Sequence, residues 1–228
     1  MVEEVKVTDI KKIAIIGGTG KEGKGLAFRW AKAGYEVLIG SRNIEKAEKA
    51  VLELKELFGG EEISINGMEN WQAIEAADIA VLTVPYKFHR NVLESFKNQL
   101  KGKILIDVTV PLVPPKVTKV QMPEEGSAAQ QAQKILGDDS VVVAAFQSIS
   151  FENLLKDGQP ECDILVCGKK RNARLAVLKL VKDAGLIGWD AGYLENAVVV
   201  EGMTSILIGL NKKHGTKSAG IRITGIER

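Results

Sequence analysis

Four glycines near the start of the chain have the spacing of a dinucleotide-binding motif. Gly18, Gly20 and Gly23 form Gly-x-Gly-x-x-Gly, and Gly17 precedes them. Such glycines allow a tight turn, a close approach of the backbone to a pyrophosphate, and close packing of a helix on a strand. The apolar run Ile13–Ile16 comes just before the motif and an amphipathic helix just after it, as the motif requires. A helix N-terminus here offers N–H groups and a positive dipole end to phosphates; a glycine-rich turn without a ligand is the alternative.

The residues after the second expected strand indicate NADP rather than NAD. This strand is expected at Val37–Ile39, and a strand that serves NAD is followed by an acid about 20 residues after the glycines. Here the chain reads Ser41-Arg42, a hydroxyl and a guanidinium that suit a 2′-phosphate, which an acid would repel. Lys46, one helical turn further, and the hydroxyl of Thr19 are additional candidates. In the alternative interpretation Ser41 is only a helix N-cap, and the two cations lie on a solvated helix face.

The composition is that of a globular protein with one domain and a small second one. The 228 residues are 45% hydrophobic and 26% charged with a net charge of +2, so no basic excess indicates a nucleic-acid partner. The first ten residues carry acids and no long apolar core, which argues against a signal peptide. No apolar stretch approaches the ~18 residues of a membrane-spanning helix. We therefore expect a cytoplasmic protein.

The cysteines and histidines form no metal-binding pattern. Cys162 and Cys167 lie on one expected strand at an odd spacing, so their side chains point to opposite faces, which disfavours a shared metal ion or a disulfide. His89 and His214 are the two histidines of the chain, so no zinc site of the Cys/His type can be assembled. We expect no bound metal and interpret all four residues as structural or solvent-facing.

An alternation of short apolar strands and helices predicts a Rossmann-like, doubly wound parallel α/β sheet over residues 1–149. In such a sheet ligands bind outside the carboxyl ends of the strands. This rule puts Val84, Val110 and Leu112 beside a bound cofactor, and the alternative is that they form ordinary strand ends and turns. The further strands are expected at residues 63–65 (with Gly67 ending that strand), Ile79–Val84, Lys103–Thr109 and Val141–Ala145, and the helices at residues 42–58, Asn70–Ala77, Phe88–Leu100 and Gly126–Leu136.

Residues 150–228 differ in pattern and are expected to form a small C-terminal α+β domain. Strands at Asp163–Val166 and Leu186–Trp189 flank a helix at Asn172–Asp183. Tyr193–Leu210 is apolar all round, which predicts burial within the domain or against a second subunit. The basic tail that follows is ordinarily a solvated segment, and the alternative is that it attracts a polyanionic ligand.

The chain lacks the acid–base groups of alcohol dehydrogenases. It has no Tyr-x-x-x-Lys motif and no histidine after a late strand. Asp107 and Glu201 are interpreted as isolated carboxylates, one at a strand end and the other on a helix surface. A sheet that binds NADP implies hydride transfer, and the missing acid–base set favours an acceptor that holds the charge itself, such as a flavin-like ring.

A set of motifs covering nearly the whole chain beyond residue 10 is specific in combination. The set comprises IAIIGGTGKEGKGLA, VLIGSR followed by EKA, DIAVLTVP, VPLVP, the strand and loop at Val143–Ser150, ILVCG, and GMTSILIGL with AGI. These motifs resemble the NADPH-dependent F420 reductases, the F420H₂:NADP⁺ oxidoreductases of archaea and some bacteria. The resemblance implies a dimer that exchanges a hydride between the nicotinamide C4 of NADP and C5 of the 5-deazaflavin coenzyme F420. The implied partners are these small-molecule coenzymes, without nucleic acid or membrane.

Carried over position by position, the resemblance implies two groups of binding residues. Members of the family often carry histidine where this chain has Gln147, and serine where it has Gly202. The NADP group is Thr19, Gly20, Lys21, Glu22, Ser41, Arg42 and Lys46, with Val84, Val110, Leu112 and Ser150 near the nicotinamide half. The F420 group is Gln147, Ile149, Thr204, Gly220 and Ile221.

Two other functions stay open at this point. NADPH-dependent imine reductases of the pyrroline-5-carboxylate reductase kind share the fold, but they build their site from a long C-terminal helical dimerisation domain. The segment after the sheet is short here and contains two expected strands, which counts against this alternative. The other is a redox-sensing protein that binds NADP(H) without turnover, and the sequence holds no DNA-reading module that would favour it.

Overall fold

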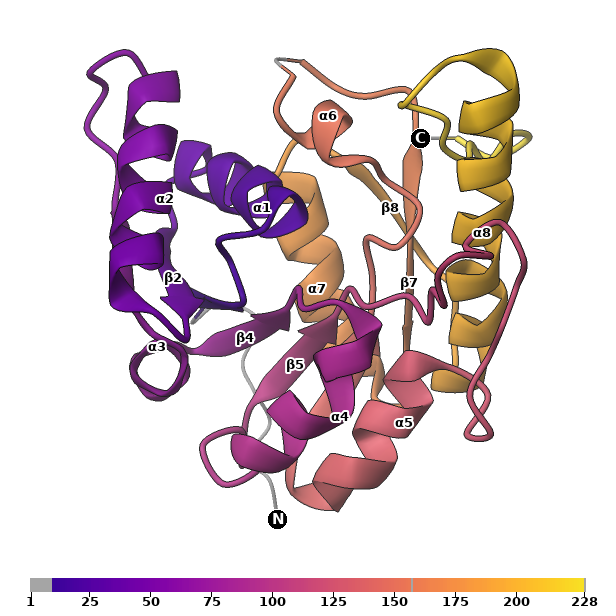
Figure 1. The fold of residues 1–228 in the computed structure, drawn as a ribbon, viewed down its shortest axis with the longest axis horizontal. Coiled ribbons are helices and arrows are strands. Elements are labelled where there is room, and N and C mark those ends of the chain that lie inside the picture. The colour runs from indigo at the N-terminus through magenta and orange to yellow at the C-terminus, as the bar shows by residue number, and fades with distance from the viewer. Residues whose placement is uncertain (1–9, 157, 228) are drawn as a thin grey trace.

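The computed structural model describes residues 10–156 and 158–227, and the strands of this part form one eight-stranded sheet (Figure 1). Neighbouring strands are parallel, except β6 (Val141–Ala144) and β7 (Asp163–Gly168), which are antiparallel. The structure thus confirms the predicted Rossmann-like α/β sheet. In spatial order the strands are β3 (Ile65–Glu69), β2 (Glu36–Ser41), β1 (Lys12–Ile16), β4 (Ile79–Leu82), β5 (Ile104–Asp107), β6, β7 and β8 (Ile187–Asp190).

The strand order turns back at the centre of the sheet, between β1 and β4. From β1 the chain first winds outward through β2 to β3 and then returns to the other side of β1. In doubly wound sheets this switch point opens a crevice at the carboxyl ends of the strands, where ligands bind. The acids that argue against a signal peptide lie in the first ten residues. Of these ten residues, the structure describes only Ile10.

Helices cover both faces of the sheet because the strands are apolar on both sides. Ile13 and Ile15 of β1 belong to the core under one set of helices, whereas Ala14 and Ile16 belong to the clusters under the other set. The first set is α1 (Lys21–Lys32), α2 (Ile44–Leu57), α6 (Phe151–Leu154) and α7 (Arg171–Asp183), and the second is α3 (Asn70–Ala76), α4 (Tyr86–Ser95), α5 (Ala128–Leu136) and α8 (Ala197–His214).

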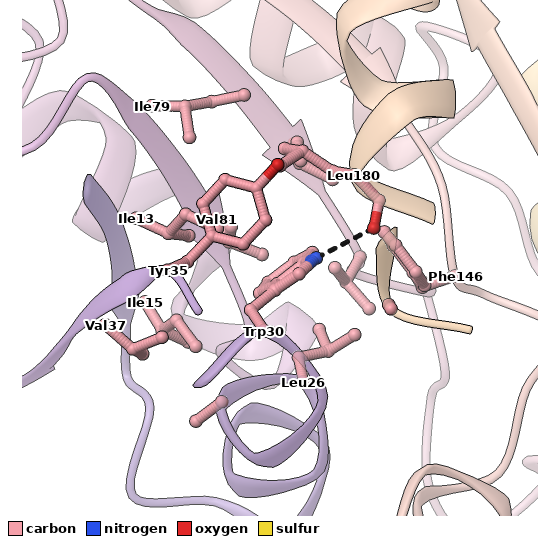
Figure 2. Packing of buried hydrophobic residues seen from close by; sticks show 14 of the residues in the cluster. Ile13, Ile15, Leu26, Trp30, Tyr35, Val37, Ile79, Val81, Phe146 and Leu180 are labelled. Atoms are coloured by element: carbon pink, nitrogen blue, oxygen red, sulfur yellow. Dashed lines mark hydrogen bonds between the residues drawn. The ribbon is translucent and has the colours of Figure 1, made fainter. Parts of the chain in front are cut away.

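Trp30 of α1 joins the N-terminal and C-terminal parts of the chain (Figure 2). Its indole is fully buried, and Nε1 donates a hydrogen bond to the backbone oxygen of Leu180 in α7 over 3.0 Å. The ring of Phe146 meets the indole edge-on, with 5.6 Å between the ring centroids. Because Phe146 directly precedes the polar run at Gln147, this packing fixes the base of that loop.

The sheet shows where Gly67 lies and on which faces the two cysteines are buried. Gly67 does not end the third strand but lies within β3, opposite Ile39. A Cβ on Gly67 would lie 2.8 Å from the carbonyl carbon of Ala47, so this glycine lets α2 pack closely on the sheet. Cys162 and Cys167 are both buried, and they belong to cores on opposite faces, which confirms the prediction from their spacing.

The C-terminal tail is held against β7 rather than free in solvent. The backbone N–H of Asp163 donates to the oxygen of Ile221 over 2.7 Å, and the N–H of Ile223 donates to the Asp163 carboxylate over 2.8 Å. The interpretation of the tail as simply solvated is therefore wrong for this stretch, although basic side chains such as Lys217 and Arg222 remain exposed. The division into domains at residue 149 stays a prediction.

Candidate functional site

The glycine loop forms a tight cradle between β1 and α1. Gly17 has φ +72°, and a Cβ there would lie 2.6 Å from Cγ1 of Val84, the residue predicted near the nicotinamide. A Cβ on Gly23 would lie 2.7 Å from Cα of Gly18, so only glycine allows the first turn of α1 to pack on the loop. The N–H of Gly18 donates to the oxygen of Gly40 in β2 over 3.0 Å. The loop therefore has the shape that brings backbone close to a pyrophosphate.

Asn70, at the start of α3, orders this loop and was missed by the sequence analysis. Its side-chain oxygen accepts a hydrogen bond from the N–H of Gly17 over 3.1 Å, and the residue is buried. A Cβ on Gly40 would lie 2.7 Å from the same oxygen. An asparagine after a short strand gives no signal in the sequence that it will reach a loop 53 residues away.

The N-terminus of α1 presents its first turn to the loop. Gly20 is the N-cap, and no side chain caps the helix, so the first N–H groups are left for a ligand. Thr19 is partly exposed beside them, and the exposed Lys21 places its ammonium 4.7 Å from the ring centroid of Phe151 in α6. Glu22 is partly exposed as a residue, but its Oε1 is buried and has no hydrogen-bond partner among residues 10–156 and 158–227. Burial raises the pKa of Glu22 to about 8.

The end of β2 carries the residues predicted to recognise the 2′-phosphate. The N-cap of α2 is Asn43, which accepts a hydrogen bond from the N–H of Lys46 over 3.0 Å. Ser41 is therefore not the N-cap; it is buried, and its Oγ accepts from the N–H of Asn43 over 3.2 Å. Arg42 and Lys46 are exposed, and no carboxylate of the described residues forms an ion pair with either. Two unpaired cations at this edge favour an anion there.

The residues predicted near the nicotinamide follow β4, β5 and β6, three neighbouring strands on one side of the switch point. Val84 follows β4 and contacts the glycine loop. Val110 and Leu112, both partly buried, form a narrow turn in which the N–H of Leu112 donates to the oxygen of Val110 over 2.7 Å. Ser150 is the N-cap of α6, with its Oγ accepting from the N–H of Asn153. Helix α6 packs closely on α1 at Gly25. A Cβ on this glycine would lie only 2.8 Å from Cβ of Leu154.

The residues predicted to contact F420 gather around the loop after β6. The hydroxyl of Thr204 in α8 donates to the backbone oxygen of Gln147 over 2.7 Å. Gln147 is buried, and its Oε1 has no hydrogen-bond partner in the part of the chain that the structure describes. Ile149 is buried in the same loop, and a Cβ on Gly220 would lie 3.6 Å from the oxygen of Ser148. The structure therefore brings Gln147 and Thr204 into contact, with the tail alongside.

Asp107 and Glu201 are not the isolated carboxylates that the sequence suggested. Nε2 of His89 lies 2.8 Å from Oδ2 of Asp107, and both side chains are fully buried. Glu201 is buried rather than on a helix surface, and its two oxygens accept hydrogen bonds from the N–H groups of Ala128 and Ala129 over 2.7 and 3.1 Å. Glu201 thus caps α5 from α8, with its carboxyl group at the N-terminal end of that helix.

These three side chains form a buried ionisable network under the sheet edge. Burial raises the pKa of Glu201 to about 8, with the charge of Asp107 acting in the same direction and the N–H groups of α5 opposing it. Burial lowers the pKa of His89, but the charge and the hydrogen bond of Asp107 outweigh it, so the pKa is raised above its ordinary value. Sequence reasoning missed the network because its members come from α4, β5 and α8, far apart in the chain.

The other chemical possibilities are limited by burial. Burial raises the pKa of both cysteine thiols, that of Cys167 to about 11, so neither is an activated nucleophile. Within residues 10–156 and 158–227, no group of three or more His, Cys, Asp or Glu side chains is arranged to hold a metal ion. No helix in the same part of the chain has the length and apolarity needed to cross a membrane.

Comparisons with known proteins agree with one another. The model of a family described as "NADP oxidoreductase coenzyme F420-dependent" matches residues 12–111. The F420-dependent NADP reductase of Methanocaldococcus jannaschii is 41% identical over 225 residues, which cover 95% of this chain and 99% of that protein. The F420-dependent NADP reductase of Methanothermobacter thermautotrophicus is 42% identical over 223 residues, or 95% and 96% of the two chains. A solved structure from Arthrobacter sp. FB24, proposed to be an F420-dependent NADP-reductase, shares the fold with a TM-score of 0.79 at 20% identity, covering 94% and 99%.

Proposed function

The chain belongs to the family of F420-dependent NADP reductases, and we propose that it transfers a hydride between NADP(H) and the 5-deazaflavin coenzyme F420. The observation that carries the proposal is the position of two half-sites at the same end of the sheet, after β4 and after β6, with β5 between them. Val84 contacts the glycine loop after β4, and Asp107 at the end of the paired strand β5 accepts a hydrogen bond from Gln147. Two ring systems held by these residues would lie at the same edge of the sheet.

The residues of the first half-site fit NADP. The tight glycine loop and the uncapped N-terminus of α1 suit the pyrophosphate, and the exposed Arg42 and Lys46 suit the 2′-phosphate. Ser41, with its hydroxyl at the end of β2, is a further donor on that side. Val84, Val110, Leu112 and Ser150 are proposed to line the nicotinamide half, and Gly18, Thr19, Gly20, Lys21, Glu22 and Gly23 to surround the phosphates.

The residues of the second half-site fit a deazaflavin with an anionic tail. The unpaired Oε1 of Gln147 can accept from a ring N–H, and Ile149 offers an apolar contact beside it. Thr204 holds the backbone of Gln147, while Gly220 and Ile221 bring the tail to the same loop. The exposed basic side chains of the tail are suited to phosphate and carboxylate groups.

The chain contributes alignment more than acid–base chemistry. The nicotinamide supplies or takes up the hydride, and the deazaflavin holds the resulting charge in its own ring. The task of the protein is then to hold the two rings in contact and to exclude water between them. The hydrogen bonds of Gln147 to Asp107 and Thr204 fix the loop that would carry one ring. The buried His89 holds the side chain of Asp107, the residue whose backbone oxygen accepts from Gln147.

A homodimer in the cytoplasm is the setting we propose for this reaction. Apolar side chains on α8 and just before it face solvent in the single chain, with Val199 64% and Ile206 50% exposed. Tyr193, 72% exposed, extends the same stretch of chain. Exposed apolar groups of this kind are typical of surfaces that pack against a second subunit.

The test is a direct assay of the purified protein with F420 and each nicotinamide coenzyme. We expect rapid loss of the visible absorbance of oxidised F420 with NADPH and little with NADH. Tight binding of NADPH without loss of that absorbance would contradict the proposal and point back to an imine reductase or a sensor. An imine substrate and a gel-filtration series run in parallel would separate those two alternatives and report the oligomeric state.

A further inference from the structure

Two cations from different elements lie over the ring of Phe88 in the first turn of α4. The guanidinium of Arg42 is 5.3 Å from the ring centroid, and the ammonium of Lys87 is 4.8 Å from it. Arg42 follows β2, whereas Lys87 and Phe88 follow β4, so the ring bridges two strands that are separated by β1. A cation over an aromatic face is attracted by the ring quadrupole, which keeps both charges at this place.

The ring lies at the same edge of the sheet as the glycine loop. Pro85 is the N-cap of α4, and β4 ends three residues before it, so the first turn of α4 stands at the carboxyl end of that strand. The carboxyl ends of β1 and β2 lie beside it, because these strands are parallel and adjacent (Figure 1). The cations therefore surround the adenosine side of the predicted dinucleotide site, not its nicotinamide side.

The charge at this place is uncompensated. Lys87 is exposed like Arg42 and Lys46, and in the part of the chain that the structure describes none of the three forms an ion pair with a carboxylate. Holding like charges together without a counter-ion costs free energy, and an anion bound among them removes that cost. A doubly charged phosphate suits three cations better than a single carboxylate does.

We propose that Lys87 and Phe88 complete the site for the 2′-phosphate of NADP. This inference rests on the proposed function and extends it to two residues of α4. Phe88 is a positioning residue: its ring holds the Arg42 guanidinium at this place through a cation–π contact, and the guanidinium N–H groups can donate to phosphate oxygens. Lys87 is a further binding residue, whose ammonium adds charge from α4, whereas Lys46 lies in α2.

The experiment compares two ligands that differ only in the 2′-phosphate. Binding of adenosine 2′,5′-bisphosphate and of adenosine 5′-monophosphate is measured by calorimetry on the full chain, without F420 or turnover. Phe88→Leu should weaken the bisphosphate about threefold, as expected for the loss of one partly exposed cation–π contact. Lys87→Gln should weaken it about fivefold at low salt and less at high salt. Neither variant should change the affinity for the monophosphate.

Matched controls lie just beyond the end of the same helix. Phe96→Leu replaces a partly buried ring, and Lys97→Gln removes an exposed cation. Neither residue belongs to the cluster of Arg42, Lys87 and Phe88. Both controls should bind the bisphosphate like the unmodified protein. The inference is overturned if Phe88→Leu and Lys87→Gln weaken both ligands equally, if they weaken neither, or if the controls have the same effect.

The result stays separable from that of the proposed reaction. Selective loss of bisphosphate binding in the two variants supports the inference even in a protein that transfers no hydride to F420. Conversely, an active enzyme whose variants keep full selectivity for the 2′-phosphate refutes the inference and leaves the proposed function standing.

Discussion

The side-chain amide of Gln147 donates a hydrogen bond to the backbone oxygen of Asp107 over 2.8 Å. This bond ties the loop after β6 to the end of the neighbouring strand β5. The same residue is held from the other side, because the hydroxyl of Thr204 donates to its backbone oxygen over 2.7 Å. Gln147 is thus fixed by β5 and α8 at once, and its free Oε1 has one defined orientation.

This arrangement predicts that replacing Gln147 affects F420 and spares NADPH. Gln147→Leu removes the side-chain donor to the backbone oxygen of Asp107, which keeps only the longer bond of 3.4 Å from the N–H of Ala145, and it removes the acceptor offered to the ring. We expect kcat/KM for F420 to fall by roughly tenfold or more, with the dissociation constant of NADPH unchanged. Gln130→Leu, at a partly exposed glutamine of α5, is the matched control. An equal loss for both coenzymes would move the second half-site elsewhere.

Arg42 should decide the choice between NADPH and NADH. Arg42→Glu replaces an exposed, unpaired cation with a charge that repels the 2′-phosphate. We expect KM for NADPH to rise by at least about 30-fold, while KM for NADH stays the same or falls. Lys55→Glu makes the same charge change at the far end of α2 and should have little effect. An unchanged preference in Arg42→Glu would refute the assignment of the 2′-phosphate site.

Glu22 should make the affinity for NADPH fall as the pH rises above neutral. Burial raises its pKa to about 8, so at neutral pH the side chain is uncharged and would not repel the pyrophosphate that we propose binds at this loop. As the pH rises through that value the carboxylate ionises, and the affinity for NADPH should fall. Fluorescence titrations of Glu22→Gln should show no such fall, whereas Glu48→Gln, at an exposed position of α2, should behave like the unmodified protein. A fall that persists in Glu22→Gln would contradict this role.

Glu201 should make the stability of the fold fall with rising pH. Its pKa is about 8 in the folded protein and 4.5 when unperturbed, so the folded state retains a proton that the unfolded state has lost between these values. The stabilisation is complete below the lower value and is lost as the pH rises through the higher one. The raised pKa of His89 acts in the same direction. In urea unfolding, the free energy of unfolding should decrease by a few kcal/mol as the pH rises over this range. The decrease should be smaller in Glu201→Gln. A decrease of equal size in the variant would refute this assignment.

Local patterns were sufficient to predict the fold. Apolar runs such as Ile13–Ile16 and the glycines after them determine strand, turn and helix within a few residues of one another, and the structure has each of them where expected. Candidates for the nucleotide half-site could be named for the same reason, since Ser41 and Arg42 lie at the distance along the chain from the glycines that the motif prescribes. The position of each site residue toward a coenzyme stays a prediction.

Long-range pairing could not be predicted. The residues next to His89, Asp107 and Glu201 in the sequence do not indicate which side chains these three meet. Glu201 in particular has the sequence context of an ordinary residue on a helix surface. The contact arises because α4 and α5 pack side by side and α8 returns over the start of α5. Asn70 escaped notice in the same way, because the loop that it holds lies across the sheet. Such pairs depend on tertiary packing, which a single sequence does not display.

The most direct test of hydride transfer measures the transfer of deuterium rather than a change in absorbance. The protein is incubated in ordinary water with F420 and NADPH that carries deuterium at both C4 positions, and the reduced deazaflavin is analysed by mass spectrometry. If the two rings meet at the edge formed by Val84 and Gln147, one deuterium is transferred to C5 of F420 and none is lost to water. Reduced F420 without deuterium would show that the hydrogen comes from solvent, and it would contradict direct transfer between the two coenzymes.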